Sequence, residues 1–417
     1  MNVTANFSPG CPFAAGYDPL APATVADPHT PLRELRIDAP VAYVPGFDHY
    51  ILTRFADVEK VLLDRATWSC SNASAPLIPV GAAAAAVLAD GFKRVPTLNN
   101  ADPPRHGPMR RSVLTVMTPM RLNALEPTLR AYARNLIIEM LEHPVVDFVE
   151  ALSFPFPGFA AFSLLGFPEQ DTEQLKVWSR TRVLLTYGRL TDDEQVAVAH
   201  DIVGMWRYVE DFVASRMTEP ANDLTSDLVR LSREKPDQVN EFDIVNIVYS
   251  MALAGHETTS NTIGNGVRAL LTYRDQWQRL LDDPTLITNA VEEILRFDGP
   301  VINHRRLAKV DTEIDGVAIP AGSKVMLGFA SAGRDDTMFD DPDTFDVGRP
   351  NADRHLEFGR GAHYCLGAPL GRLETRIVLE LLRELAPNIA LVPDQEFVYT
   401  PNALFRGLQK LMVLPNG

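Results

Sequence analysis

The stretch FGRGAHYCLG at residues 358–367 places one cysteine, Cys365, among three glycines and directly before an amphipathic helical pattern. A sulfur at the N-terminus of a helix lies near the positive end of the helix dipole, which favours the thiolate over the thiol. Because Gly361 and Gly367 carry no side chains, a flat and bulky partner can lie against this backbone while free N–H groups bond the sulfur. The pattern indicates a thiolate that faces a bound group, although a lone cysteine is more often buried and inert.

A second stretch, ALAGHETTS at residues 252–260, places an acid and three hydroxyl residues inside a predicted helix from about Asn240 to Tyr273. The helix opens with an Asn240 to Asp243 capping pattern and is apolar on almost every side, so it is expected to cross the core. Burying the carboxylate of Glu257 there without a partner would cost free energy. The stretch therefore indicates either a functional site or a core helix whose Ser and Thr side chains bond back to their own carbonyls.

The spacing of both stretches resembles the cytochrome P-450 superfamily of haem-thiolate monooxygenases. The haem-ligand pattern F-x-x-G-x-x-x-C-x-G is matched by Phe358, Gly361, Cys365 and Gly367. The oxygen-activation pattern A-G-x-[DE]-T-[ST] is matched by Ala254, Gly255, Glu257, Thr258 and Thr259. The resemblance implies haem b (iron protoporphyrin IX) ligated by the Cys365 thiolate, with dioxygen as co-substrate, since a thiolate ligand favours O–O cleavage.

The same resemblance assigns roles on the long helix. Thr258 would hydrogen-bond the bound dioxygen in a locally opened helix, and Glu257 would relay protons to it. Ala254 would lie against the haem. His256, which sits between these residues, is expected to be a helix-packing residue and not a ligand.

An acid and an arginine, Glu293 and Arg296, lie at i and i+3 on one face of a later predicted helix. The resemblance identifies them as the E-x-x-R pair of the family, which forms a buried ion-pair network with an arginine best matched here by Arg349. The network is expected to hold the cysteine loop in place.

Haem carries two propionates, so cationic donors from separate segments are expected to converge on them. The residues carried over by motif position are His106, Arg110, Arg306, His355 and His363.

A distal substrate pocket is also expected from the resemblance. The residues positioned to line it are Met251, Leu253, Ala254, Val301, Ile302, Asn303, Leu404 and Phe405. They are mainly apolar, with one amide and one aromatic ring, and no obvious pair of cations is available to bind a carboxylate. The expected substrate is a small, hydrophobic, aromatic compound, and the expected reactions are ring or benzylic hydroxylation or O-dealkylation of an aryl ether.

Two segments, YGRLTDDEQVAVAHDIVGMW at 187–206 and VPDQEFVYTPNALFRG at 392–407, narrow the resemblance. They are similar to the haem domains of bacterial self-sufficient monooxygenases that are fused to a phthalate-dioxygenase-type reductase. Because this chain stops at LPNG without a flavin or iron-sulfur segment, electrons are expected from a separate ferredoxin or reductase. A positive patch for that partner is expected from Arg110, Arg111, Arg360 and Arg372.

Two other functions remain open at this point. One is a peroxide-driven haem-thiolate peroxygenase, which would have no need of the Glu257–Thr258 relay. The other is a non-enzymatic haem-binding sensor or carrier in which Cys365 only anchors the haem.

The elements that must position these residues are mostly helical. A cytochrome P-450 fold is expected as a single large domain over residues 1–417, with an extended N-terminal segment at about 1–25 and a smaller strand-containing part from both chain ends. The predicted elements are strands in VAYVP and HYILTR, helices at 56–64 and within 81–92, helical spacing from 120 to 281, a helix ending near Phe297, a hairpin at Asp315-Gly316 and a helix from Leu366 to Leu385.

Composition limits the remaining possibilities. The 417 residues carry a formal net charge of −15, which argues against broad nucleic-acid binding. Cys11, Cys70 and Cys365 are an odd and widely spaced set, so neither a disulfide framework nor a paired-cysteine zinc site is indicated, and Cys11 and Cys70 are treated as incidental. With no signal-peptide pattern and an apolar stretch at 151–168 that prolines interrupt, the protein is expected to be cytoplasmic and not membrane-spanning.

Overall fold

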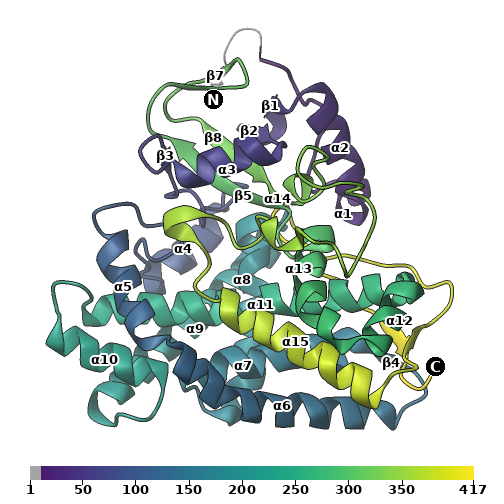
Figure 1. Cartoon of the computed structure of the whole chain (residues 1–417). Helices are drawn as coiled ribbons and strands as arrows, with labels where there is room; N and C mark the ends of the chain where they lie inside the picture. The colour runs from purple at the N-terminus through teal and green to yellow at the C-terminus, as the bar shows by residue number, and fades with distance from the viewer. Residues whose placement is uncertain (1–10) are drawn as a thin grey trace.

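The computed structural model describes residues 11–417, which form a helical part and a smaller part built around a mixed sheet (Figure 1). The mainly helical fold predicted from the sequence is confirmed. The main helices of the larger part are α4 (Ala82–Gly91), α5 (His106–Val116), α6 (Pro119–Leu141), α7 (Pro155–Leu165), α8 (Thr172–Tyr187), α9 (Asp192–Thr218), α10 (Leu224–Glu234), α11 (Glu241–Thr272), α12 (Arg274–Asp282), α13 (Ile287–Asp298) and α15 (Ala368–Leu385).

Helix α11 crosses the interior of the helical part, as its apolar pattern predicts. It begins at a capping box in which the Asn240 side chain accepts from the N–H of Asp243 and the Asp243 side chain accepts from the N–H of Asn240. Helices α7, α8, α9, α13 and α15 pack against it, and the largest hydrophobic cluster of the described residues surrounds it. A helix so enclosed gives its polar residues a fixed position, which is what a catalytic site requires.

The sheet of the smaller part has the strand order β1-β2-β8-β5-β3. Its strands are β1 (Val41–Val44), β2 (His49–Leu52), β8 (Lys324–Gly328), β5 (Asn303–Ala308) and β3 (Trp68–Ser69). The predicted antiparallel pair β1–β2 is confirmed, with Val41 opposite Leu52, and β2 pairs in parallel with β8. Early and late strands of the chain thus share one sheet, and α2 (His29–Asp38), α3 (Phe55–Leu63) and α14 (Phe329–Ala332) lie beside it, while Val25 of α1 (Pro22–Ala26) packs against the helical core.

Two smaller sheets complete the fold. The predicted hairpin is β6 (Thr312–Ile314) with β7 (Val317–Ile319), and both turn residues, Asp315 and Gly316, have positive φ. The C-terminal strands β9 (Ala390–Leu391) and β10 (Met412–Leu414) form the third sheet with β4 (Val146–Asp147).

The N-terminal segment differs in part from the expectation of an extended stretch over about 1–25. Residues 1–10 lie outside the described residues. Residue Phe13 bridges to Tyr43 beside β1, but α1 then begins at Pro22 within the segment expected to be extended. A proline at the first turn is compatible with this helix because its missing N–H has no partner there.

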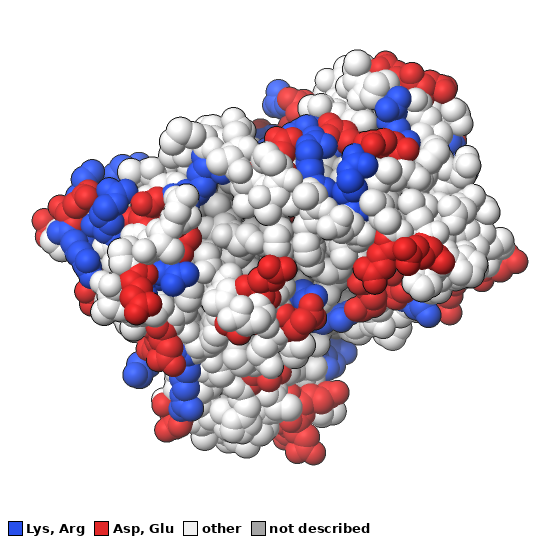
Figure 2. Space-filling view, turned by 90° about the horizontal axis from the view of Figure 1, so that it is seen from below, with Lys and Arg blue, Asp and Glu red and all other residues white. Residues whose placement is uncertain are grey.

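The apolar stretch at 151–168 is a core helix, as predicted. It contains the end of a π-helical turn, Val149–Ser153, and then α7, whose Pro155 and Pro157 lie in the first turn. No helix among residues 11–417 is long and apolar enough to span a membrane. Acidic and basic side chains alternate on the face in Figure 2, which shows no continuous basic area.

Candidate functional site

The cysteine loop is a tight turn between the 3₁₀ helix Gly361–His363 and α15. The N–H of Cys365 donates to the carbonyl of Phe358 at 2.8 Å, which closes the loop. Gly359 and Gly361 have φ of +67° and +66°, a conformation that side-chain-bearing residues rarely adopt. Of the two glycines read from the sequence, Gly361 is therefore a backbone requirement of this turn, whereas Gly367 has an ordinary φ of −80°.

The electrostatic environment of Cys365 has opposing influences. The side chain is exposed, yet protein surrounds it closely on its other sides, and this desolvation raises the pKa of the thiol above its usual value. The N–H groups of Gly367 and Ala368, together with Arg110 and Arg372, favour the thiolate and lower that pKa in part. The N–H groups at the start of α15 thus lower the pKa of the Cys365 thiol, as predicted, but desolvation raises that pKa by more.

The oxygen-site sequence lies in the middle of α11. The side chain of Ala254 is exposed although α11 is an interior helix, so this part of the helix faces a space between elements. The Thr258 hydroxyl donates to the Ala254 carbonyl at 2.8 Å, and α11 is α-helical from end to end. The locally opened helix expected at Thr258 is therefore not present, because the hydroxyl bonds back to the preceding turn without disturbing its hydrogen bonds.

Glu257 and His256 have different environments on α11. One carboxylate oxygen of Glu257 is buried without a hydrogen-bond partner, and burial raises the pKa of this carboxyl to about 8, with Arg180 opposing the shift. Glu257 is therefore mostly protonated at neutral pH and can donate a proton. His256 is fully buried, with Nε2 3.0 Å from the Phe154 carbonyl and Nδ1 2.7 Å from the Ser179 hydroxyl, which agrees with the predicted packing role.

The three residues of the predicted ion-pair network come together in the structure. Arg296 donates to both oxygens of Glu293 at 2.6 and 2.8 Å, and Nε of Arg349 lies 3.2 Å from the same carboxylate. The side chains of Glu293 and Arg296 are fully buried. The remaining guanidinium N–H groups of Arg296 donate to the carbonyls of Gly333, Pro342 and Thr344, so the network fastens the irregular segment to α13.

A second carboxylate network lies beside the first, and sequence analysis missed it. Arg372 donates two hydrogen bonds to Glu292, at 2.6 and 2.7 Å, and its guanidinium lies 4.4 Å from the centre of the Phe358 ring. Although burial alone would raise the pKa of Glu292, hydrogen bonds from Arg372 and His355 hold it at about 2. In the sequence, the two adjacent acids Glu292 and Glu293 on one predicted helix could have indicated this second network.

His355 is consequently not a propionate donor, contrary to the expectation from motif position. Its Nε2 lies 3.2 Å from Glu292, and its Nδ1 accepts from the N–H of Glu357 at 3.1 Å. Both ring nitrogens have hydrogen-bond partners, so His355 connects the segment before the cysteine to α13.

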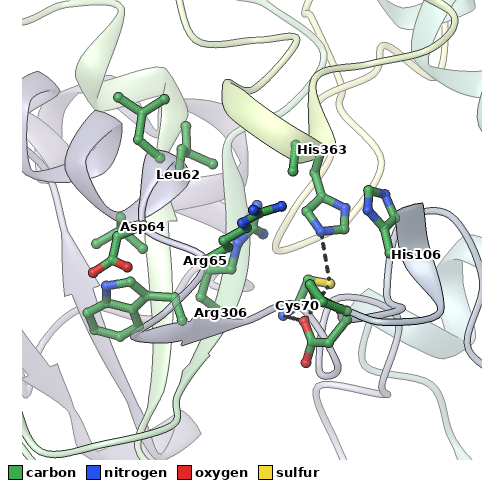
Figure 3. A pocket seen from close by; sticks show the side chains of 13 residues that line it. Leu62, Asp64, Arg65, Cys70, His106, Arg306 and His363 are labelled. Carbon is green, nitrogen blue, oxygen red and sulfur yellow. Dashed lines mark hydrogen bonds between the residues drawn. The ribbon is translucent and has the colours of Figure 1, made fainter. Parts of the chain in front are cut away.

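Three of the other predicted propionate donors line one cavity, shown in Figure 3. The rings of His106 and His363 lie 4.0 Å apart, and Nε2 of His106 is buried without a partner. Arg306 contacts His304 and a backbone carbonyl but forms no ion pair among the described residues. Arg110 lies nearby and donates to the Tyr364 carbonyl at 2.6 Å. These groups form a cationic, hydrogen-bonding cluster suited to carboxylates.

Cys70 also belongs to this cavity, although the sequence suggested no role for it. Its sulfur lies 3.4 Å from Nε2 of His363 and 3.3 Å from the Asp102 carboxylate. Burial and the nearby Asp102 raise the pKa of the Cys70 thiol to about 12, so this sulfur stays protonated. Cys11 is buried against the sheet and has no comparable surroundings.

The predicted pocket residues fall into two groups. Val301 bridges to Phe405, the Ile302 N–H donates to the Leu404 carbonyl at 2.7 Å, and the Asn303 amide donates to the Ala403 carbonyl. Backbone contacts thus bring these two segments together, Val301, Ile302, Asn303 and Leu404 are buried, and the Phe405 ring lies 5.4 Å from that of Tyr187. The second group consists of Met251 and Leu253, which are partly buried against the helical core.

Two buried acids near the cysteine were not predicted. Glu357 accepts from the Val301 N–H at 3.0 Å, and a Cβ at Gly299 would overlap its carboxyl, so it ties the cysteine loop to the pocket surface. Both oxygens of Glu374 on α15 lack partners, and burial raises the pKa of this carboxyl well above its usual value. Its position one turn after Leu370, on the apolar face of α15, was the available signal.

The expected positive docking patch is not formed as predicted. Arg372 is paired with Glu292, Arg110 bonds the Tyr364 carbonyl, and Arg360 lies 3.6 Å from Glu59. Of the four arginines, Arg111 alone is exposed and without an ion pair within residues 11–417. Local acids therefore pair with two of the four arginines, Arg360 and Arg372.

Comparisons with known proteins agree with this geometry. The family model described as Cytochrome P-450 matches residues 205–385. The chain is 35% identical to the vitamin D(3) 25-hydroxylase of Pseudonocardia autotrophica, over 93% of each chain. The structure of cytochrome P-450 CREJ in complex with (4-ethylphenyl) dihydrogen phosphate is 36% identical, with a TM-score of 0.92 over 96% of this chain and 99% of that one. An intact type IV self-sufficient cytochrome P-450 monooxygenase is 37% identical, with a TM-score of 0.94 over 99% of this chain and 55% of that one.

Proposed function

Because the chain belongs to the cytochrome P-450 family of haem-thiolate monooxygenases, we propose that it oxidises a small aromatic compound. The proposed reaction is hydroxylation of the ring or of a benzylic carbon, or O-dealkylation of an aryl ether. The observation that carries this proposal is the apolar cluster of Val301, Ile302, Leu404 and Phe405, which backbone contacts bring together from two segments, with the Phe405 ring 5.4 Å from that of Tyr187. Aromatic and aliphatic side chains of this kind suit a flat hydrophobic substrate. The similar CREJ structure contains an aryl phosphate, which supports an aromatic substrate for this chain.

The residues present fit the haem b that members of this family carry. The exposed Cys365, a small exposed residue at Ala254, the unpartnered Nε2 of His106 and the guanidinium of Arg306, which has no ion pair among residues 11–417, are groups that fit a flat iron porphyrin with two carboxylates. Cys365 would hold the iron, and His106, Arg110, Arg306 and His363 would hold the propionates. When bound, the haem activates dioxygen so that one oxygen atom is inserted into the substrate.

The residues of α11 contribute a proton donor and a hydroxyl. Glu257 is protonated at neutral pH because burial raises its pKa to about 8, so it can supply a proton inside the helical core. The Thr258 hydroxyl can exchange its bond to the Ala254 carbonyl for one to a ligand beside α11. Such rotation needs no change in the helix backbone.

Electrons are proposed to come from a separate ferredoxin or reductase. Arg111 remains the exposed cation available to such a partner near the cysteine loop.

The test has a ligand step and a substrate step. The absorption spectrum of the reduced protein with carbon monoxide is expected to show a strongly red-shifted Soret band that Cys365→Ala abolishes. Cys70→Ala is the matched control, because its thiol lies in the neighbouring cavity, and it is expected to keep the band. Product analysis with a ferredoxin, its reductase and either guaiacol or 4-ethylphenol should then show O-demethylation or hydroxylation. A retained band in Cys365→Ala, or no aryl product, would contradict the respective half of the proposal.

A further inference from the structure

The short segment 299–302 joins α13 to β5 and belongs to the proposed substrate pocket. Two backbone hydrogen bonds, of 2.9 and 2.7 Å, pair it with residues 404–406, and they lie on either side of the antiparallel bridge between Val301 and Phe405. In an antiparallel pair, the N–H groups of successive residues point to opposite sides of the strand. The Val301 N–H therefore points away from Phe405 and needs an acceptor from elsewhere in the molecule.

The side chain of Glu357 supplies that acceptor. Its Oε2 accepts from the Val301 N–H at 3.0 Å. Val301 is 9% exposed, and a buried N–H without an acceptor would be costly. A Cβ at Gly299 would lie 2.4 Å from Cδ of Glu357, so the glycine allows the carboxyl to lie directly against the main chain of this segment.

The backbone of Glu357 belongs to the segment that carries the cysteine loop. Its N–H donates to Nδ1 of His355 at 3.1 Å, and Nε2 of the same ring lies 3.2 Å from Glu292 on α13. The carbonyl of the next residue, Phe358, accepts from the Cys365 N–H at 2.8 Å. The carboxyl that holds Val301 is thus attached to a backbone whose position relative to the sulfur is fixed.

We infer that Glu357 is a positioning residue, which sets where Val301 in the wall of the substrate pocket lies relative to Cys365. The inference rests on the proposed function, in which Val301 contacts the substrate and Cys365 holds the haem iron. One side chain then relates the pocket wall to the loop that holds the iron. Glu357 therefore determines which atom of a bound substrate lies nearest to the site of oxidation.

Three substitutions of Glu357 separate the length of the side chain from its hydrogen-bond acceptor. Burial raises the pKa of this carboxyl well above its usual value, so Glu357→Gln resembles the neutral acid and keeps an oxygen for the Val301 N–H. Glu357→Asp keeps an acceptor on a side chain that is shorter by one methylene group. Glu357→Leu fills a similar space without an acceptor.

Glu59→Leu is the matched control. Glu59 on α3 lies 3.6 Å from Arg360, which belongs to the same cysteine loop. The control therefore removes an acid that contacts the loop, while the hydrogen bond between Glu357 and Val301 stays in place.

The first measurement needs no turnover. It is the ratio of the Kd of 4-phenylimidazole to the Kd of imidazole, taken from the change in the Soret band of the holoenzyme. Both compounds can bind a haem iron through a ring nitrogen, but the larger one also extends to the pocket wall. Glu357→Leu and Glu357→Asp are expected to change this ratio by at least about fivefold, whereas Glu357→Gln and Glu59→Leu should stay within about twofold of wild type.

The second measurement is the product ratio from 4-ethylanisole, with a ferredoxin and its reductase as electron donors. O-demethylation and benzylic hydroxylation take place at opposite ends of this molecule, so their ratio reports which end lies at the site of oxidation. Glu357→Leu and Glu357→Asp are expected to change the ratio by at least about threefold, and Glu357→Gln and Glu59→Leu should retain the wild-type ratio.

The outcomes separate this inference from the proposed function. Unchanged ratios in Glu357→Leu and Glu357→Asp overturn the inference, even if stability falls, because a purely structural acid would affect stability alone. A change in Glu357→Gln as large as that in Glu357→Leu also overturns it, since glutamine keeps the acceptor. The expected pattern of Kd ratios, with no oxidation of 4-ethylanisole by wild type, supports the inference and contradicts the aromatic substrate. If Glu357→Leu fails to incorporate haem, the comparison of Glu357→Asp with Glu357→Gln decides.

Discussion

Glu293, which supports the segment before the cysteine loop, is paired with two arginines, whereas Glu257 on α11 has no ion-pair partner among residues 11–417. Glu293 is buried with Arg296 and Arg349, and every remaining donor of Arg296 meets a carbonyl. Across α11, Arg182 has no carboxylate and Glu257 has a buried oxygen without a partner. Both regions therefore contain ionisable groups in a low-dielectric interior, but only one of them neutralises the groups internally.

Paired and unpaired buried groups have different roles: the first stabilise the fold, and the second are available for binding or proton transfer. A buried charge that is fully paired stabilises one arrangement of the loop and resists change, because breaking the pair leaves an uncompensated ion. A buried group without a partner costs stability and is free to bind a ligand or exchange a proton, which is why perturbed groups cluster at functional sites. The comparison predicts that substitutions in the two regions affect different measurements.

The largest effect is expected from Glu257→Gln on the unpaired side. Loss of the proton donor should lower kcat by about 10²- to 10⁴-fold. Below pH 4.5 the free energy of unfolding should change by less than about 1 kcal/mol, because there Glu257 is protonated in both the folded and the unfolded chain and glutamine is likewise neutral. Turnover, the fraction of electrons recovered in product, and chemical denaturation of the holoenzyme are the measurements. Unchanged turnover would remove Glu257 from the mechanism.

The paired side is tested by Glu293→Gln, which should lower the free energy of unfolding by about 3–5 kcal/mol. The cause is that Arg296 and Arg349 stay buried without a counter-charge. Denaturation followed by circular dichroism and by haem absorbance provides the measurement, with Glu257→Gln as the control on the other side of α11. A loss below about 1 kcal/mol would mean that the network does not support the fold.

The pH dependence of stability sharpens the comparison further. Burial raises the pKa of Glu257 from 4.5 to about 8, so between these values the folded protein holds a proton that the unfolded chain has released. This stability is fully present below pH 4.5 and is lost as the pH rises to about 8, with a slope of at most about 1.4 kcal/mol per pH unit. The difference between wild type and Glu257→Gln over this range isolates the group. A flat difference would contradict the raised pKa.

The smallest change in the free energy of unfolding is expected at Glu126, whose ion pairs are partly exposed to solvent. Glu126 contacts Arg130 at 2.9 Å and Arg376 at 3.2 Å, and its side chain is 25% exposed. Glu126→Gln should therefore lower the free energy of unfolding by only about 0–1 kcal/mol, and high salt should reduce that difference. If Glu126→Gln lowered the free energy of unfolding as much as Glu293→Gln, ion pairs would stabilise this protein equally whether or not they are buried.

The features that sequence analysis found are those with short-range signals. The glycines around Cys365 reflect the positive φ at Gly361, and the ends of α11 follow from the Asn240 and Asp243 caps. The Glu293–Arg296 pair lies within one helical turn. In each case the physical cause acts between residues close in the chain, so spacing was sufficient.

Errors arose where a distant segment decided the outcome. His355 was expected to face the propionates, but Glu292 from α13 takes its Nε2. Arg372 was expected to be a free surface cation, yet the same carboxylate pairs with it. Cys70 was considered incidental until β3 and its following loop placed it against His363.

By itself the sequence determined the haem-thiolate loop, the interior helix with its acid and hydroxyl pair, and the family, because these depend on local geometry and residue type. Only the tertiary structure decided which buried charges are neutralised. Glu293 meets Arg349 from a distant segment of the chain, whereas one carboxylate oxygen of Glu257 is buried without a partner. A counter-ion is a property of three-dimensional proximity, and the low-dielectric interior makes its presence or absence decisive for function.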